Sequence, residues 1–398
     1  MEGCTDANSI DERPTVIVKG PHDEEKSDHK QHLLSQLEKI PKNAPKLLID
    51  KDTPSDTEWA ILGEHFSHVN DLHLSTGWNE ELNDQLMPSN WPLERLTLDS
   101  ASGELTQTPF ILEGKVKRLS LFLTSGLRFE GPTSEEFRGL YKEAVENGDI
   151  EAKYITVDEG KPEERKIELV TLPEIIYKWM KDKYTNPEPE AQPQTYTAED
   201  INLRTLEILE NDAMDTFTRL TLARAHLSLA LDTLSIRSTH GNDFHFTCED
   251  LFSQILPQLV GLQKLILAVG EISEDESFLP SFYKLFPPNL STLRFRGPVS
   301  LAKSDQWPEW IKSFENPDYL PNLKTLSFVL DLNYETKPDE TRNKDVAASE
   351  EVLREAKTAC NQLYAAAEKR GIKVEPFYDE WAERCKIFRQ VDERWEKL

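Results

Sequence analysis

Cysteine is scarce in this sequence, and its placement is uninformative for disulfide bonding. The four cysteines among 398 residues are Cys4, Cys248, Cys360 and Cys385, and none belongs to a CxxC pair. Scattered cysteines of this kind indicate reduced thiols, as in a cytoplasmic or nuclear protein. The first twenty residues also lack a basic segment followed by an apolar one, so we expect no secretory signal.

Long apolar runs and excess positive charge are also missing. No window approaches the roughly 18–20 uncharged apolar residues that a membrane-spanning helix needs. Lys and Arg number 46 against 72 Asp and Glu, which gives a formal net charge of −26. A chain this acidic repels phosphates on average. We therefore expect neither a nucleic acid nor a membrane as its partner.

Specific catalytic motifs are absent as well. The sequence contains no phosphate-binding GxxxxGK[ST] loop, no GxGxxG after a predicted strand and no GxSxG. We predict that the protein is not an enzyme and has no cofactor. One alternative remains, because the stretch HGNDFH places two imidazoles and a carboxylate at residues 240–245, where an unrecognised metal-dependent enzyme would hold its ion.

A short motif, apolar-x-x-apolar-x-apolar, recurs along the chain. It appears as LERLTL from Leu93, and again as VNDLHL, VKRLSL, LRTLEI, LDTLSI, LQKLIL, LSTLRF and LKTLSF. Apart from one large gap, its fourth position recurs at steps from 23 residues (Leu96 to Leu119) to 33 residues (Leu293 to Leu326). Periods of this size are typical of stacked repeats. The alternation within each motif predicts a short strand with one buried face, and helical stretches lie between the motifs.

These motifs resemble the LxxLxL half of the leucine-rich-repeat pattern LxxLxLxxN. The asparagine half is kept only at Asn211, and the period is uneven, so the chain is most similar to the irregular intracellular arrays: ribonuclease-inhibitor-like, F-box-associated and fungal types. No F-box precedes the array. The resemblance implies an α/β solenoid, with a curved parallel sheet, helices on its convex side and helical caps. It also implies a scaffold that binds a partner protein on the concave sheet face. The F-box likeness leaves a ubiquitin-ligase substrate receptor as an alternative.

The predicted organisation has five parts. They are a disordered acidic N-terminus (1–27), a cap with the first repeats (28–124), an inserted helix-hairpin-helix lobe with a Pro-rich linker (125–201), the remaining repeats (202–345) and C-terminal capping helices (346–398). A weaker repeat strand is expected near residues 372–374, and a polar loop is expected over NYETKPDETRNKD.

Basic side chains recur at the positions that the repeat geometry turns toward the concave face. The predicted partner-binding residues are Arg95, Arg118, Arg237, Lys264, Arg294 and Arg296. A basic face on an acidic protein attracts a complementary partner. We therefore expect a chain that is monomeric before it binds an acidic peptide or protein surface. In the alternative interpretation, these arginines pair with acidic loops of the same chain.

Overall fold

The computed structural model describes about half to two thirds of the chain. The described residues are 15–20, 29–51, 53–76, 86–101, 108–124, 139–140, 142–143, 146–147, 153–155, 164–166, 201–210, 213–223, 227–228, 230–238, 255–269, 279–336, 343–345, 348–377 and 393–398. The chain divides into two compact units, Met1–Leu127 and Arg128–Leu398. Each unit is described by itself.

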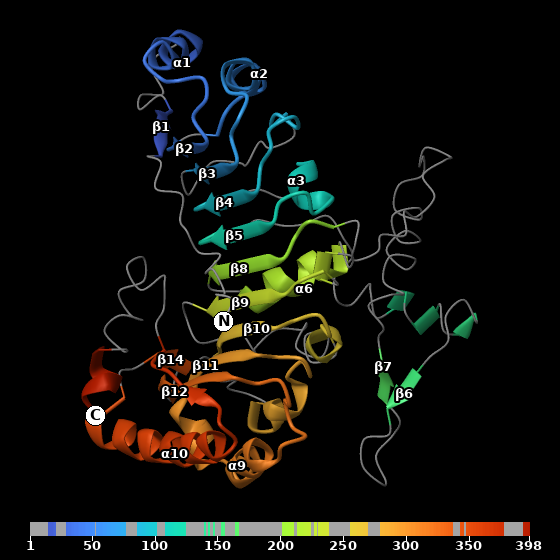
Figure 1. The fold of residues 1–398 in the computed structure, drawn as a ribbon, viewed down its shortest axis with the longest axis vertical. Helices are drawn as coiled ribbons and strands as arrows, with labels where there is room; N and C mark the ends of the chain where they lie inside the picture. Colours follow the sequence, from blue (N-terminus) through green and yellow to red (C-terminus); the bar gives the residue numbers. More distant parts are fainter. Residues whose placement is uncertain are drawn as a thin grey trace, which may run out of the picture. The chain divides into compact units, whose positions relative to one another are not determined.

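The first unit is a parallel sheet whose strands follow one another in chain order (Figure 1). Its described strands are β1 (Val16–Lys19), β2 (Lys46–Asp50), β3 (Asp71–Ser75), β4 (Arg95–Asp99) and β5 (Arg118–Phe122). Its described helices are α1 (His29–Leu37), α2 (Asp56–His65) and α3 (Pro109–Leu112). The fourth motif positions are aligned across the sheet: Leu47 lies opposite Leu72, Leu72 opposite Leu96, and Leu96 opposite Leu119.

Local sequence explains how α2 begins and what it buries. Ser55 is its N-cap, and the backbone N–H of Ser55 donates to the Glu58 carboxylate at 2.9 Å, which completes a capping box. Trp59 and Leu62 of α2 are buried, and the Trp59 ring meets the Trp91 ring edge-on with centroids 6.3 Å apart. Trp91 is buried as well, and its indole N–H donates to the Phe66 carbonyl at 2.8 Å. The helices therefore cover one face of the sheet, and the opposite face is not covered by them.

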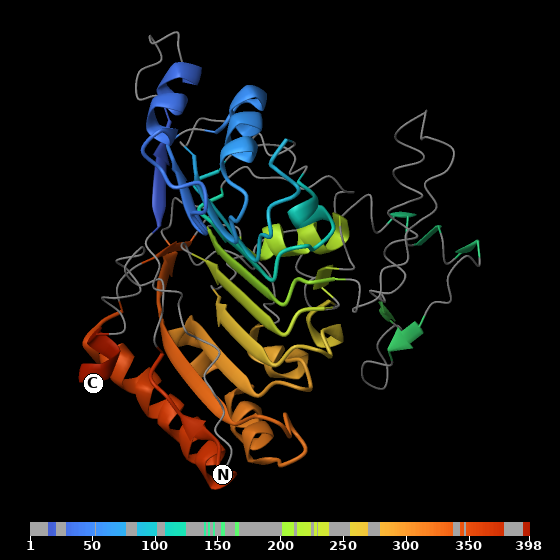
Figure 2. The ribbon, with the colours of Figure 1, turned by 45° about the horizontal axis from the view of Figure 1, so that its top comes forward.

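The second unit repeats this arrangement with a longer parallel series, seen in yellow-green to red in Figure 2. Its strands are β8 (Thr205–Glu210), β9 (Thr233–Ser238), β10 (Lys264–Ala268), β11 (Thr292–Pro298), β12 (Thr325–Leu332) and β15 (Lys373–Val374). Its helical segments are α6 (Ala213–Ala223), η3 (Leu256–Gln258), η4 (Leu279–Leu285), η5 (Val299–Lys303), α9 (Trp307–Glu315) and α10 (Glu350–Lys369). Two antiparallel hairpins pair β6 (Lys153–Ile155) with β7 (Glu164–Lys166) and β13 (Tyr334–Thr336) with β14 (Asn343–Asp345).

The register of the second unit is also set by the repeated motifs. Leu234 lies opposite Leu206 and Leu265, and Leu293 lies opposite Leu265 and Leu326. Behind the leucines of β11 and β12 is an aromatic cluster. Phe295 stacks on Phe328 with ring centroids 4.7 Å apart, and the ring of Trp310 lies within 6 Å of both. Aromatic rings bury large areas, so this cluster stabilises the end of the sheet.

The structure confirms an α/β fold with a parallel sheet, and it confirms the closing strand near residues 372–374 as β15. Ser349 caps α10, because its hydroxyl accepts from the Val352 N–H at 3.3 Å. The prediction of a polar loop after β12 is wrong, because the chain there forms β13 and β14. Alternating residues such as Tyr334 and Thr336 favour such a hairpin. No helix of the described part is long and apolar enough to cross a membrane.

Candidate functional site

The candidate site lies on the sheet face opposite the helices, here called the outer face. Its side chains come from the strand positions between the paired leucines, since successive side chains point to opposite faces. In β2, β3 and β4 these positions are half-buried, while the leucines beside them are buried. The half-buried positions are Lys46, Leu48, Asp50, Asp71, His73, Ser75, Arg95, Thr97 and Asp99. These three strands leave their outer face accessible.

Two of the predicted binding residues meet in the first unit. Arg95 and Arg118 lie opposite each other on β4 and β5. The Arg95 guanidinium is 3.6 Å from the Asp71 carboxylate, and the two side chains are 41% and 26% exposed. An ion pair this exposed contributes little to stability, and it leaves both groups within reach of a partner. A second contact joins the His73 imidazole to the Asp99 carboxylate at 3.4 Å.

The outer face of the second unit is covered along most of its strands. Arg237 is 1% exposed and Arg296 is fully buried, so neither side chain is exposed in this structure. Residues at matching positions on neighbouring strands form rows across the sheet. Arg237 of β9 and Arg296 of β11 lie in one such row, on either side of Ala268 of β10. Lys264 lies in the first row of the face, which stays half-buried. Of the four predicted residues in this unit, Lys264 and Arg294 are therefore half-buried, and Arg237 and Arg296 are buried.

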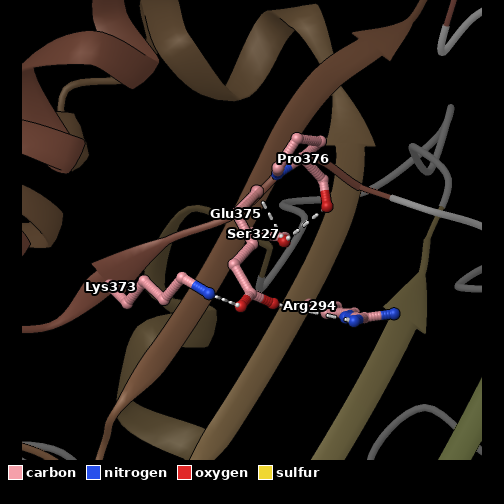
Figure 3. A network of polar contacts seen from close by, with 5 residues as sticks. All are labelled: Arg294, Ser327, Lys373, Glu375 and Pro376. Carbon is pink, nitrogen blue, oxygen red and sulfur yellow. Dashed lines mark hydrogen bonds and ion pairs between the residues drawn. The ribbon is translucent and has the colours of Figure 1, made fainter.

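A short segment of the same chain lies on β11 and β12. We call residues Glu375–Phe377 the cover segment. After β15 the backbone continues its pairing, since the Glu375 N–H donates to the Leu326 carbonyl at 2.9 Å. The Ser327 hydroxyl of β12 then contacts two carbonyl oxygens of the segment, at 2.8 Å from Glu375 and 3.2 Å from Pro376 (Figure 3).

Charged and aromatic contacts hold the same segment. The Arg294 guanidinium lies 3.8 Å from the Glu375 carboxylate, whose other oxygen is 2.8 Å from the Lys373 ammonium (Figure 3). The Phe377 ring is buried, and its centroid lies 4.5 Å from the guanidinium carbon of Arg296, a cation–π geometry. For Arg294 the structure therefore has the intramolecular pairing that the sequence left as the alternative.

Arg296 also faces a buried carboxylate. Its Nε lies 3.9 Å from an oxygen of Asp331, and both side chains are almost fully buried. Burial raises the pKa of Asp331 above its ordinary value of 3.8, although Arg296 and Arg394 act in the opposite direction. Desolvation outweighs these charges because a buried carboxylate loses its hydration. Within the described ranges, neither Asp331 oxygen accepts a hydrogen bond from a side chain or backbone group.

The residues that sequence reasoning missed are those that meet the arginines. Asp331, Glu375 and Phe377 were not assigned to any site. A signal was present, because the alternation of TLSFVLDL in β12 breaks at the apolar run Phe328–Leu330, which places apolar side chains on both faces. Such runs are typical of strands buried on both faces. This pattern indicates that something covers β12.

Metal binding finds no support in the part of the chain that the structure describes. Those residues contain no group of three or more His, Cys, Asp or Glu side chains placed to hold an ion. The stretch at residues 240–245, which carries the metal alternative, lies outside the described residues.

Comparison with known proteins adds no family assignment. The sequence matches no protein-family model, and no curated protein matches it at a significant level.

Proposed function

We propose that this chain is a leucine-rich-repeat protein that acts as a non-catalytic scaffold and binds a partner protein on the outer face of its sheet. Support comes from the repeated leucine motifs, which lie in exact alignment on neighbouring parallel strands of each unit. One strand followed by a helical return is the unit that such arrays stack, because a single unit cannot bury its apolar edge alone. The scattered cysteines favour a cytoplasmic or nuclear location for this role.

The observation that carries the proposal is the accessible outer face of β2–β4. Helices cover the other face of these strands, and outer positions such as His73 and Thr97 stay half-buried. A row of mixed charge on a rigid sheet is suited to selective binding, because complementary charges steer a partner and reject unsuitable ones. Rigid presentation also lowers the entropy that binding must overcome.

The charges on this face are sorted along the strand direction. The row at the strand starts is mainly basic, with Lys46, Arg95 and Arg118 around Asp71. The row at the strand ends carries Asp50 and Asp99 on either side of Ser75. A partner that fits this face therefore presents acidic groups toward the strand starts.

The proposal is tested by reversing the basic row. Tagged protein is purified from cells with its bound proteins, and the partner is then purified for measurement of the dissociation constant. Arg95→Glu combined with Arg118→Glu should weaken binding by at least about tenfold, because truncation or reversal of interface charges commonly costs 1.4 kcal/mol or more.

A matched control makes the same change in net charge on the helices. Lys312→Glu combined with Lys369→Glu alters two side chains that are highly exposed and pair with the surface glutamates Glu309 and Glu315. This control should bind like the wild type. Equal weakening by both double variants would show that net charge, and not the outer face, governs binding, and would refute the proposal.

A further inference from the structure

The cover segment presents three recognisable chemical groups to β11 and β12. Its acidic side chain meets Arg294, its two carbonyls meet the Ser327 hydroxyl, and its aromatic ring meets Arg296. Each contact comes from the outer face, which is the face assigned above to partner binding. An extended peptide recognised by carboxylate, backbone and aromatic contacts is a common mode of protein recognition.

The attachment of the segment is local and limited. Among the described residues, its backbone pairs with the sheet through one hydrogen bond, from the Glu375 N–H to the Leu326 carbonyl of β12, and Pro376 supplies no backbone N–H. The Arg294–Glu375 pair is long at 3.8 Å, and both side chains keep some contact with solvent. The segment can therefore be exchanged for a better ligand without loss of the sheet beneath it.

We propose that the outer face of β11 and β12 binds an extended partner segment with an acidic residue two positions before an aromatic one, and that Glu375–Phe377 occupies this site until the partner displaces it. This inference rests on the proposed function and names its ligand chemistry. The tethered segment competes at an effective concentration of about millimolar, so a free peptide binds the wild type only weakly.

The site is opened by removing the two side chains that fill it. A fluorescent peptide of residues 373–379, KVEPFYD, is titrated against full-length wild type and against Glu375→Ala/Phe377→Ala, with anisotropy as the readout. The opened variant should bind the peptide at least about tenfold more tightly than the wild type, because intramolecular competition is lost. Glu368→Ala, an exposed change on α10, is the control and should bind like the wild type.

Charge swapping identifies the contact. In the opened variant, Arg294→Glu should abolish binding of KVEPFYD and should restore binding of the peptide KVKPFYD, in which the acidic residue is replaced by lysine. A peptide with Ala in place of Phe should not bind. Binding that is indifferent to Arg294 and to the peptide's acidic and aromatic residues would overturn the inference.

Hydrogen exchange in the wild type gives an independent measurement, should the opened variant fail to fold. Excess KVEPFYD should speed exchange of the Glu375 amide, which is bonded to Leu326 in the closed site. Unchanged exchange at saturating peptide would refute displacement. If these experiments fail while the Arg95/Arg118 variant still loses its partner, only this inference falls; if the partner also binds independently of Arg95 and Arg118, the proposed function falls too.

Discussion

The buried contacts of Arg296 explain why this part of the predicted basic face is not exposed. Arg296 is enclosed between the Phe377 ring and the Asp331 carboxylate, and all three side chains are buried. Removing one member of a buried charge pair leaves the other uncompensated, which is strongly destabilising. Reversal of Arg296 would therefore test folding and not binding. Arg95 and Arg118 are better probes because both keep contact with solvent.

Asp331 gives the fold a specific pH dependence. Its pKa is raised in the folded chain, mainly by burial, so the folded state holds this proton more tightly than the unfolded state. Its contribution to stability is then fully present below pH 3.8 and is lost as the pH rises through the folded pKa. Asp331→Asn should thus gain stability relative to the wild type as the pH rises through that window.

Urea unfolding of both proteins at a series of pH values measures this difference. Subtracting the two curves removes the effect of the other carboxylates, which are common to both proteins. The measured quantity is the free energy of unfolding of Asp331→Asn minus that of the wild type. If this difference stays constant or falls as the pH rises, the assigned direction of the pKa shift is contradicted.

Among the elements, the end of β11 is packed so closely that there is no room for a side chain at position 297. Gly297 lies at a register shift in the β11–β12 pairing. A Cβ built there would lie 2.7 Å from a ring carbon of Phe295, which stacks on Phe328 in the aromatic cluster. Gly297→Ala should lower the free energy of unfolding by about 1–3 kcal/mol, because overpacking forces such rings out of position.

Gly139→Ala is the matched control for this change, since a Cβ at that position meets nothing within 4 Å. Both variants are compared with the wild type by denaturant unfolding. A Gly297→Ala protein as stable as the control would show that the ring cluster is loosely packed, contrary to the structure.

The strands and their register were largely predictable from the sequence. The segments that pack on the outer face of the strands were not. Aligned leucines such as Leu72 and Leu96 set the register, because a shift of one residue would turn the apolar side chains to the wrong face. DLHLS and RLTLD alternate strictly, and burial alternates along KLLID as well, so all three strands have a half-buried outer face. The contacts of Glu375 and Phe377 join residues that are far apart in the chain, and periodicity carries no information about such pairs.

At the level of the whole molecule, each unit uses its outer face differently. In the first unit β2–β4 present sorted charges, with Arg95 and Asp99 at opposite ends of one strand. In the second unit the row at the strand starts is half-buried and most positions beyond it are buried, and Ser327 of β12 contacts the cover segment.

The central claim is that the partner binds on the outer sheet face, and site-specific photo-crosslinking tests it most directly. Benzoylphenylalanine is placed either at Thr97, on the outer face of β4, or at Glu64, on the exposed side of α2. We predict a covalent adduct with the partner from Thr97 and none from Glu64. An adduct from Glu64 together with none from Thr97 would place binding on the helices and contradict the account.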